Sequence, residues 1–183
     1  MPQIEPRDPD DAFASARAGE AAGFAMLVRL HQALVYGIAL RMLMDRALAE
    51  DLSQEVFLQM YRSLHTINSP EHLAFWLRRI TAHRAIDRLR QERRAGTTTL
   101  EEAVEVFTAS PGDDPMLRKH LHSLMDRLAP MARAVLLLRY QEDLDPVEIA
   151  RTLEIPVNTV KSHLKRSLSL LRRQLSGMAS ISP

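Results

Sequence analysis

Apolar and polar residues follow one another along the segment 144–173 in a pattern that predicts two helices separated by a short turn. Pro146 suits the first turn of a helix, because its missing N–H would be unpaired there anyway. Pro156 ends that helix, since proline disfavours helical geometry in the residue before it. Asn158 or Thr159 is then available to cap a second helix that begins near Val157. The apolar face of the first helix is predicted to contain Val147, Ala150 and Leu153. The second helix repeats apolar residues at spacings of three and four, namely Val157, Val160, Leu164, Leu168, Leu171 and Leu175.

The opposite face of that second helix is polar and basic. Its members are Asn158, Ser162, Lys165, Arg166 and Ser169, flanked by Lys161 and His163. An α-helix fits the DNA major groove, where such side chains donate to base edges and phosphates. The alternative is an amphipathic hairpin with a solvated basic face, but the short turn before the basic helix favours a DNA-binding helix-turn-helix.

The same helical period recurs through the rest of the chain. It predicts a frayed helix over 11–18, then helices over 20–44, 46–64, 71–94, 115–128 and 130–140. Asn68-Ser69-Pro70 breaks the period and predicts a loop. The expected domain organisation is an N-terminal helical domain over 8–94, a linker over 95–114 and a C-terminal helix-turn-helix domain over 115–177.

Apolar stripes define the predicted core of the N-terminal domain. The helix over 20–44 contributes Phe24, Leu27, Val28, His31, Leu34, Val35, Ile38 and Met42. The next helix contributes Leu48, Leu52, Val56 and Met60. The third has one face of Leu73, Trp76, Leu77 and Ile80 and another of Phe75, Ala82, Ile86 and Leu89. Trp76 is therefore predicted to be a core residue rather than a platform for stacking bases.

Composition supports an all-α fold of two small helical domains. Among the 183 residues, only 5% are aromatic, and good helix formers such as Ala, Leu, Arg, Glu and Met dominate. There is no cysteine, which excludes disulfides and thiolate metal sites. The start of the chain is polar and acidic, so we do not expect it to be a signal peptide. No apolar stretch is expected to approach the roughly 20 residues that span a bilayer. We expect a cytoplasmic protein.

The net charge is only +1, but the charges are unevenly distributed. Residues 78–94 hold seven arginines opposed only by Asp87 and Glu92, and residues 161–173 are basic without an acid. Between these blocks the segment 95–114 has acids and no base: Glu101, Glu102, Glu105, Asp113 and Asp114. Two basic blocks around an acidic spacer indicate two DNA-facing modules on a tether.

A second polar face lies on the helix predicted over 46–64. It gathers Asp51, Gln54, Glu55, Leu58 and Arg62, opposite Leu52, Val56 and Met60. The charges alone are typical of a solvated face, but interfaces pair an apolar anchor such as Leu58 with a polar rim. A paired-carboxylate active site is disfavoured, because no nucleophile or set of metal ligands accompanies these acids.

No catalytic constellation emerges, and we expect neither an enzyme nor a cofactor nor a metal site. HExxH is absent among the seven histidines, and His120 and His122 are two apart on a helix, which directs them to different sides. The nucleotide-binding pattern GxxxxGK[ST] is also absent, so ATP is not expected to drive any step.

Taken together, three segments resemble the extracytoplasmic-function (ECF) group of bacterial sigma factors, the short two-domain initiation subunits of RNA polymerase. They are AEDLSQEVFLQMYRSL, then FWLRRITAHRAIDRLRQERR, then LAPMARAVLLLRYQEDLDPVEIARTLEIPVNTVKSHLKRSLSLLRR. Their order and spacing and the variable linker agree with that family over nearly the whole chain. The helix-turn-helix alone would be shared by many regulators.

The resemblance implies a role for each matching residue. The face that docks on core RNA polymerase would be Asp51, Gln54, Glu55 and Leu58. The loop 65–72 would capture a flipped base of the minus-ten element, and its candidate residues are Asn68, Ser69 and His72. The helix over 76–88 would grip the same element, and its candidate residues are Arg79, His83, Arg84 and Arg88. The minus-thirty-five element would be read by Asn158, Thr159, Lys161, Ser162, His163, Lys165 and Arg166. The arginines Arg79, Arg84 and Arg88 would mainly hold phosphates.

Two residues depart from the family pattern. His83 stands where such factors often have asparagine, so the base it prefers is open. Glu154 stands where the helix-turn-helix commonly has glycine, and a positive φ there would cost on the order of 1 kcal/mol.

The resemblance also implies the partners, which are core RNA polymerase, promoter DNA and an anti-sigma factor. One competing interpretation is a dimeric helix-turn-helix regulator that binds operators without core polymerase. It explains the C-terminal motif. It leaves unexplained the polar face of the helix over 46–64, the arginine-rich helix and the acidic segment 95–114. Another is a helical protein-interaction module with incidental basic patches.

Overall fold

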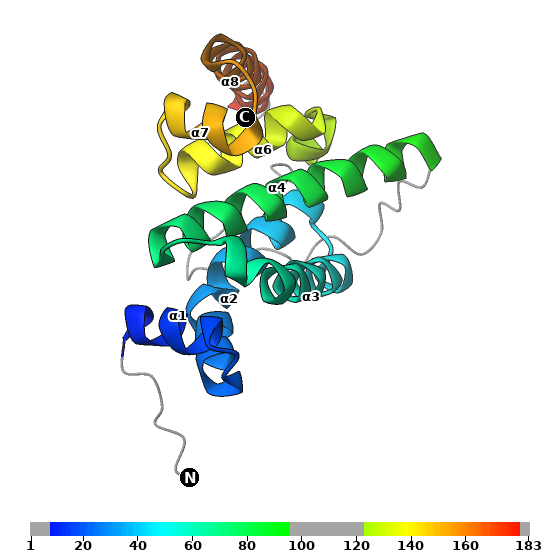
Figure 1. Cartoon of the computed structure of the whole chain (residues 1–183). Coiled ribbons are helices and arrows are strands. Elements are labelled where there is room, and N and C mark those ends of the chain that lie inside the picture. The colour runs from blue at the N-terminus through cyan, green and yellow to red at the C-terminus, as the bar shows by residue number, and fades with distance from the viewer. Residues whose placement is uncertain (1–7, 96–122, 180–183) are drawn as a thin grey trace. The chain divides into compact units, whose positions relative to one another are not determined.

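The computed structural model describes residues 8–95 and 123–179, with side chains described as far as Arg173 (Figure 1). Over these residues the ordered elements are helices and no strand occurs, so the all-α prediction is confirmed. The chain divides into two compact units, and the boundary falls inside a helix, after Ala85. The predicted linker acids, most of the helix expected over 115–128, and His120 and His122 lie outside the described residues.

The first unit is a set of helices joined by short turns. Its elements are α1 (Pro9–Arg17), α2 (Ala21–Leu43), α3 (Arg46–Ser63), the 3₁₀ turn η1 (Leu64–Thr66) and the start of α4 (Pro70–Ala95). The long helix α2 packs against both α1 and α3. α3 is followed directly by η1, which also contacts α1. The predicted helices over 20–44, 46–64 and 71–94 therefore agree with the structure to within a residue or two at their ends.

Short polar side chains mark where these helices begin. Asp8 accepts a hydrogen bond from the Asp11 backbone N–H at 2.8 Å, and Asp45 accepts one from the Leu48 N–H at 2.9 Å. Each carboxylate satisfies a donor that has no partner inside the helix. The helix predicted over 11–18 is present as Pro9–Arg17, and it begins two residues earlier because Asp8 caps it and Pro9 stands in its first turn.

The core of the first unit contains the predicted apolar stripes. Its fully buried large side chains are Leu27, Ile38, Met42, Leu52, Met60, Ile67, Leu73 and Leu77. Each contributes roughly 1.5–3 kcal/mol by leaving water. His31 and Trp76, assigned to the stripes, are only half-buried. The stripes thus identify the core correctly, and their edges reach the surface.

Close packing of α1 on α2 depends on Gly23. This residue is buried, and a Cβ added to it would overlap the backbone nitrogen of Ala16 and the side chain of Ser15. The turn between the two helices is closed by the Ser15 hydroxyl, which donates to Glu20 Oε2 at 2.6 Å. Only a residue without a side chain allows the two backbones to approach this closely.

Gly23→Leu should therefore lower the free energy of unfolding by about 1–3 kcal/mol, the usual cost of inserting atoms into a packed interface. Urea unfolding followed by circular dichroism measures it. Gly37→Ala is the matched control, because its Cβ would meet only the flexible guanidinium of Arg41. A Gly23→Leu protein as stable as the parent would show that α1 is not held at this contact.

The helix α2 corrects one expectation about membranes. Its 23 residues are long and apolar enough to span a bilayer by length and composition alone, with a mean hydropathy of 1.4 over an 18-residue window. The sequence pattern concealed this because polar residues such as Arg29 and Gln32 interrupt the apolar run. α1 and α3 both pack on α2, and the side chains that α2 buries include Leu27, Val35, Ile38 and Met42, although only 28% of the apolar window is buried.

The second unit contains the helix-turn-helix. Its main elements are α6 (Pro130–Tyr140), α7 (Pro146–Leu153) and α8 (Val157–Ala179), preceded by helical residues 123–127. All three named helices contact one another. The apolar stripe of α8 packs on a cluster of Leu128, Ala132 and Leu136 through Leu164, Leu168, Leu170 and Leu171. The predicted starts at Pro130, Pro146 and Val157 are confirmed.

Two local predictions about the helix-turn-helix are wrong. Val147 is 45% exposed, and Ile149 is the fully buried residue of that turn of α7. A capping box fixes where α7 begins, because Asp145 accepts from the backbone N–H groups of Val147 and Glu148 and the Glu148 side chain accepts from the Asp145 N–H. At the next helix, neither Asn158 nor Thr159 is the cap. Because α8 begins at Val157, both residues lie inside its first turn, where the Thr159 and Val160 N–H groups donate to the Pro156 carbonyl at 2.9 and 3.2 Å.

The turn between α7 and α8 requires a left-handed residue. Glu154 caps the C-terminus of α7 with φ 54° and ψ 42°, and its N–H donates to the Ala150 carbonyl. This confirms the positive φ expected where family members commonly have glycine. A residue with a Cβ loses roughly 1–2 kcal/mol in this conformation.

Glu154→Gly should consequently raise the free energy of unfolding by about 1 kcal/mol relative to Glu154→Ala. The alanine variant is the proper reference, because both changes remove the same glutamate contacts and differ only in the Cβ. Denaturant midpoints of the two proteins measure the difference. Equal midpoints would mean that the turn relaxes away from the left-handed conformation.

Candidate functional site

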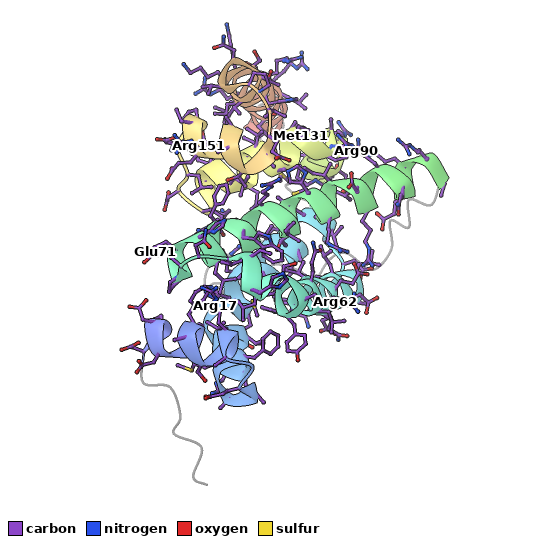
Figure 2. All side chains as sticks on the ribbon, in the orientation of Figure 1. Arg17, Arg62, Glu71, Arg90, Met131 and Arg151 are labelled. Carbon is purple, nitrogen blue, oxygen red and sulfur yellow. The ribbon has the colours of Figure 1, made fainter. Side chains whose placement is uncertain are left out.

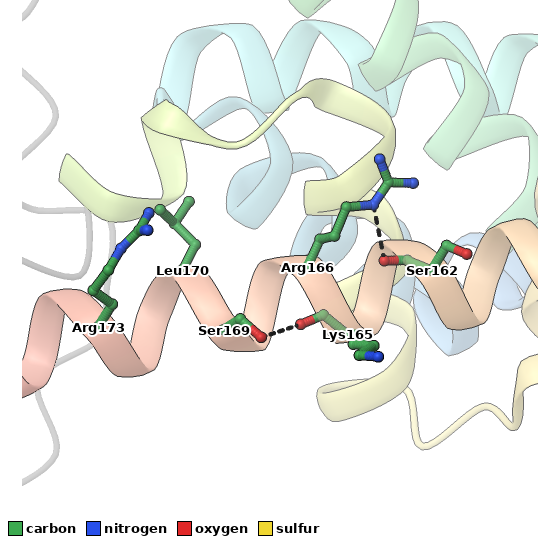
Figure 3. A pocket seen from close by; sticks show the side chains of 6 residues that line it. All are labelled: Ser162, Lys165, Arg166, Ser169, Leu170 and Arg173. Carbon is green, nitrogen blue, oxygen red and sulfur yellow. Dashed lines mark hydrogen bonds between the residues drawn. The ribbon is translucent and has the colours of Figure 1, made fainter.

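One face of α8 forms a cationic concavity. Its volume is about 590 Å³, and its lining residues are Ser162, Lys165, Arg166, Ser169, Leu170 and Arg173 (Figure 3). Three of the predicted minus-thirty-five residues, Ser162, Lys165 and Arg166, thus meet in one depression. Among the described residues that line it, none is acidic, so the surface suits an anionic ligand.

Hydrogen bonds to the helix backbone order part of this surface. The Arg166 Nε donates to the Ser162 carbonyl at 3.2 Å, and the Ser169 hydroxyl donates to the Lys165 carbonyl at 2.8 Å (Figure 3). The guanidinium of Arg166 is therefore steered along the helix before any ligand arrives. A side chain that is already oriented loses less conformational freedom on binding.

The remaining minus-thirty-five candidates surround this concavity without lining it. Asn158 and Lys161 are exposed, while Thr159 and His163 are half-buried. Partial burial, and then the positive charge of Arg166, lower the pKa of His163 below its ordinary value. His163 is therefore a neutral imidazole at pH 7 and adds no positive charge to the face.

Arg173 is a further residue of this site, beyond those predicted from the sequence. Arg173 follows Arg166 by seven residues, which is two helical turns, and the same spacing separates Ser162 from Ser169. From that spacing, the basic face predicted for α8 could have been extended to Arg173.

The polar face of α3 is also presented at the surface. Asp51 and Gln54 are exposed, Glu55 is half-buried, and Leu58 is 59% exposed. Tyr61, which the sequence analysis did not assign, is 64% exposed beside this face, and its ring meets Phe24 of α2 edge to face at 5.1 Å. An apolar anchor bordered by carboxylates and an amide is the composition expected of a protein-binding surface.

The loop before α4 is held in a defined shape. Ile67 is buried and anchors it. The His72 N–H donates to the Ser69 hydroxyl at 3.2 Å, and the Asn68 N–H donates to Nδ1 of His72 at 3.3 Å. The pKa of Glu71 is lowered by its own backbone N–H and then by the Ser69 hydroxyl, which keeps this carboxylate charged at the start of α4 (Figure 2). The three predicted loop residues are thus brought together, with Asn68 and His72 exposed.

Arg84 has a different environment from the one expected of a phosphate-binding residue. Its Nη1 donates to Glu55 Oε2 at 2.9 Å, and its Nε and Nη2 donate to Gln59 Oε1 at 3.0 and 2.6 Å. The structure therefore joins a residue assigned to the polymerase-binding face to one assigned to the minus-ten helix. The other candidates on α4, which are Arg79, His83 and Arg88, are half-buried.

Two further ionisable side chains have structural surroundings. The pKa of His31 is lowered by burial and then by the charge of Arg78, which keeps this α2 residue neutral. Arg133 is buried in the second unit, where it donates to the Met125 carbonyl and, at 2.9 Å, to Asp126 Oδ1. Burial is the main cause of its lowered pKa. The Arg133 guanidinium is enclosed and satisfied by these acceptors, so it is not exposed to a ligand.

Within residues 8–95 and 123–179, no group of three histidine or acidic side chains could hold a metal ion. The features that the structure does present are a helix-turn-helix with a cationic concave face, an arginine-rich helix and an exposed acidic-apolar face. They define the class of helix-turn-helix DNA-binding proteins, here with an additional exposed acidic-apolar face.

Comparison with known proteins gives the family. Sigma-70 region 2 matches residues 27–95, and sigma-70 region 4 matches residues 118–171. The chain is 28% identical over 172 residues to the ECF RNA polymerase sigma factor SigW of Bacillus subtilis (strain 168), covering 87% of this chain and 92% of SigW. It is 30% identical over 176 residues to the ECF RNA polymerase sigma factor SigK of Mycobacterium tuberculosis (strain H37Rv), covering 90% and 92% respectively.

A solved structure has the same fold. It is CnrH in complex with the cytosolic domain of CnrY, which matches with a TM-score of 0.65 and 21% sequence identity over 93% of this chain and 99% of that one. With both sigma-70 regions in order and relatives matched over nearly their full length, the chain belongs to the ECF group of the sigma-70 family of transcription initiation factors.

Proposed function

We propose that this sigma factor binds core RNA polymerase and directs it to specific promoters through three surfaces. The observation that carries the proposal is that region 2 and region 4 occur in order, and that each contains an exposed face of matching chemistry. The acidic-apolar face of α3 lies within region 2, and the cationic concavity of α8 begins within region 4.

The α8 face is proposed to read the minus-thirty-five element. A helix enters the major groove, where Lys165 or Arg166 can donate to the O6 and N7 acceptors of guanine. Asn158, Thr159, Lys161, Ser162 and His163 are proposed to contribute further contacts to bases and phosphates. Arg173, at the far end of the concavity, is suited to a phosphate, which positions the helix without specifying sequence.

The α3 face is proposed to dock on core polymerase through Leu58, with Asp51, Gln54 and Glu55 forming its polar rim. Leu58 is 59% exposed in the free protein, and burying such an anchor inside a polar rim is typical of residues that dominate binding energy. The three rim residues favour a partner surface rich in positive charge and hydrogen-bond donors.

The loop 65–72 and α4 are proposed to open the minus-ten element by capturing a flipped base. Extruding a base costs a few kcal/mol, and the chain has no nucleotide-binding motif that could couple ATP to this step. Contacts with polymerase and between arginines and phosphates offset that cost. The hydrogen bonds among Asn68, Ser69 and His72 support this role, since a preformed loop loses little entropy on capturing a base.

The remaining assignments follow from family membership. Sigma factors are generally non-catalytic, and we expect no enzymatic activity and no cofactor. We also propose that the protein acts in the cytoplasm, and that an anti-sigma factor covers its polymerase-binding surfaces. The solved complex of CnrH with the cytosolic domain of CnrY supports the last point by analogy.

Run-off transcription tests the proposed function. Core polymerase with this protein should initiate at defined promoters, and core polymerase alone should not. The competing dimeric regulator predicts instead that the purified protein binds a palindromic operator tightly without polymerase. Failure to bind core polymerase or to select a start site would exclude the proposed function.

A further inference from the structure

A single arginine connects the two proposed surfaces of the first unit. Arg84 of α4 donates through each of its three guanidinium nitrogens to α3, at 2.9 Å to Glu55 and at 3.0 and 2.6 Å to Gln59. The Arg84 and Glu55 side chains are 40% and 43% exposed, so both are within reach of an incoming partner. This bridge therefore lies where α3 and α4 both meet solvent.

The two ends of the bridge have competing uses. Glu55 belongs to the face proposed to dock on polymerase, and a cation on the polymerase would compete with Arg84 for its carboxylate. Arg84 belongs to the helix proposed to grip the minus-ten element, and a DNA phosphate would compete with Glu55 for its guanidinium. All three nitrogens of Arg84 already donate to α3, so only the second N–H of each Nη atom is left for a phosphate, and the whole guanidinium fork can turn toward DNA only after the bridge opens.

We propose that Arg84 is a positioning residue that acts as a latch, and that docking of polymerase on α3 opens it and releases Arg84 to DNA. This inference rests on the proposed function of the α3 face. In the free factor the latch keeps the arginine away from phosphates. In the holoenzyme the competing polymerase cation takes the Glu55 carboxylate, and the freed guanidinium adds a phosphate contact on α4.

The latch has a thermodynamic consequence with a definite sign. Breaking the bridge is part of the work of binding polymerase, so removing Arg84 should tighten binding to core polymerase. A half-exposed ion pair with two added hydrogen bonds corresponds to a change of about three- to tenfold. Because coupling between two ligands is reciprocal, promoter DNA should strengthen polymerase binding in the parent protein and do so less in the variant.

Arg84→Gln tests the latch in the full-length protein. Fluorescence anisotropy of the labelled factor, titrated with core polymerase in the absence of DNA, should give about three- to tenfold tighter binding than the parent. Gln59→Ala removes one acceptor of the bridge and should tighten binding in the same direction by a smaller factor. The matched control is Arg90→Gln, which removes the same charge from α4 at a residue farther along the helix (Figure 2). Arg90 pairs with Asp87 of its own helix at 3.2 Å.

The second measurement uses holoenzyme and a DNA fragment with a single-stranded minus-ten element. Arg84→Gln should weaken this binding by at least threefold, whereas Gln59→Ala leaves the guanidinium in place and should not weaken it. Arg84→Lys keeps the charge but lacks the planar fork needed to reach both acceptors, so it should restore part of the DNA binding while retaining tight polymerase binding.

The latch is overturned if Arg84→Gln binds core polymerase as tightly as the parent, or more weakly, while its thermal melt stays like that of the parent. Arg84 would then only hold α3 and α4 together. If Arg84→Gln does not fold, the direction of the change in Gln59→Ala decides in its place. The proposed docking role of the α3 face fails by a different result, which is unimpaired polymerase binding after Leu58 and Glu55 are both replaced. The two failures are thus distinguishable.

Discussion

Replacing Leu58 with arginine and Glu55 with lysine should abolish co-purification of this sigma factor with core RNA polymerase. Leu58 is 59% exposed on α3 and offers the apolar anchor of the proposed docking face, while Glu55 supplies part of its acidic rim. Truncating a central anchor typically costs about 2 kcal/mol or more. Adding two positive charges opposite a cationic partner brings the expected loss of affinity to roughly a hundredfold or more.

The experiment is affinity purification of tagged factor from cells, followed by titration of the purified variant against core enzyme. Asp10→Lys provides the control, because Asp10 is an exposed carboxylate of α1 that belongs to none of the proposed surfaces. It should bind polymerase like the parent. Retention of core enzyme by the double variant would place the docking surface elsewhere on the molecule.

Arg166→Ala should weaken promoter binding and relax base preference within the minus-thirty-five element. The Arg166 guanidinium lines the concavity of α8 and is steered by its hydrogen bond to the Ser162 carbonyl. Loss of a bidentate contact with guanine costs about 1–3 kcal/mol at the contacted base pair. To locate that base pair, transcription is measured from a set of promoters that differ at each minus-thirty-five position. The base preference of the parent is compared with that of the variant.

Arg172→Ala separates charge from sequence recognition. Arg172 is an exposed cation of α8 that is not among the residues lining the concavity. Its loss should weaken binding to all promoter variants by a similar factor, with no change in preference. If Arg166→Ala leaves both promoter strength and base preference unaltered, Arg166 does not read a base.

Helix positions could be predicted from the sequence because their signals are local. Pro130, Pro146 and Val157 begin the helices that the structure contains, since a proline near a helix start and its effect on the preceding residue depend on neighbouring residues only. The apolar period identified Leu27, Leu52 and Leu77 as core for the same reason. Exposure of Leu58 also followed, because it lies opposite the apolar stripe of its own helix.

The residues that were mispredicted or missed depend on the neighbours that each side chain meets. Val147 and Ile149 are both apolar, and only the packing of α7 against α6 and α8 decides that Ile149 is buried. Tyr61 could have been linked to Leu58 by its spacing of three, but its contact with Phe24 joins two different helices.

The sequence by itself determined that this chain is helical, where its helices begin, and which faces of α3 and α8 carry the candidate chemistry. These properties depend on periodicity and on contacts between residues a few positions apart. The tertiary structure alone decided that Arg84 is paired with Glu55 and Gln59, which are 29 and 25 residues away, and that Arg133 is enclosed in a core. Such outcomes depend on how helices pack, because burial and long-range hydrogen bonds are settled only when distant segments meet.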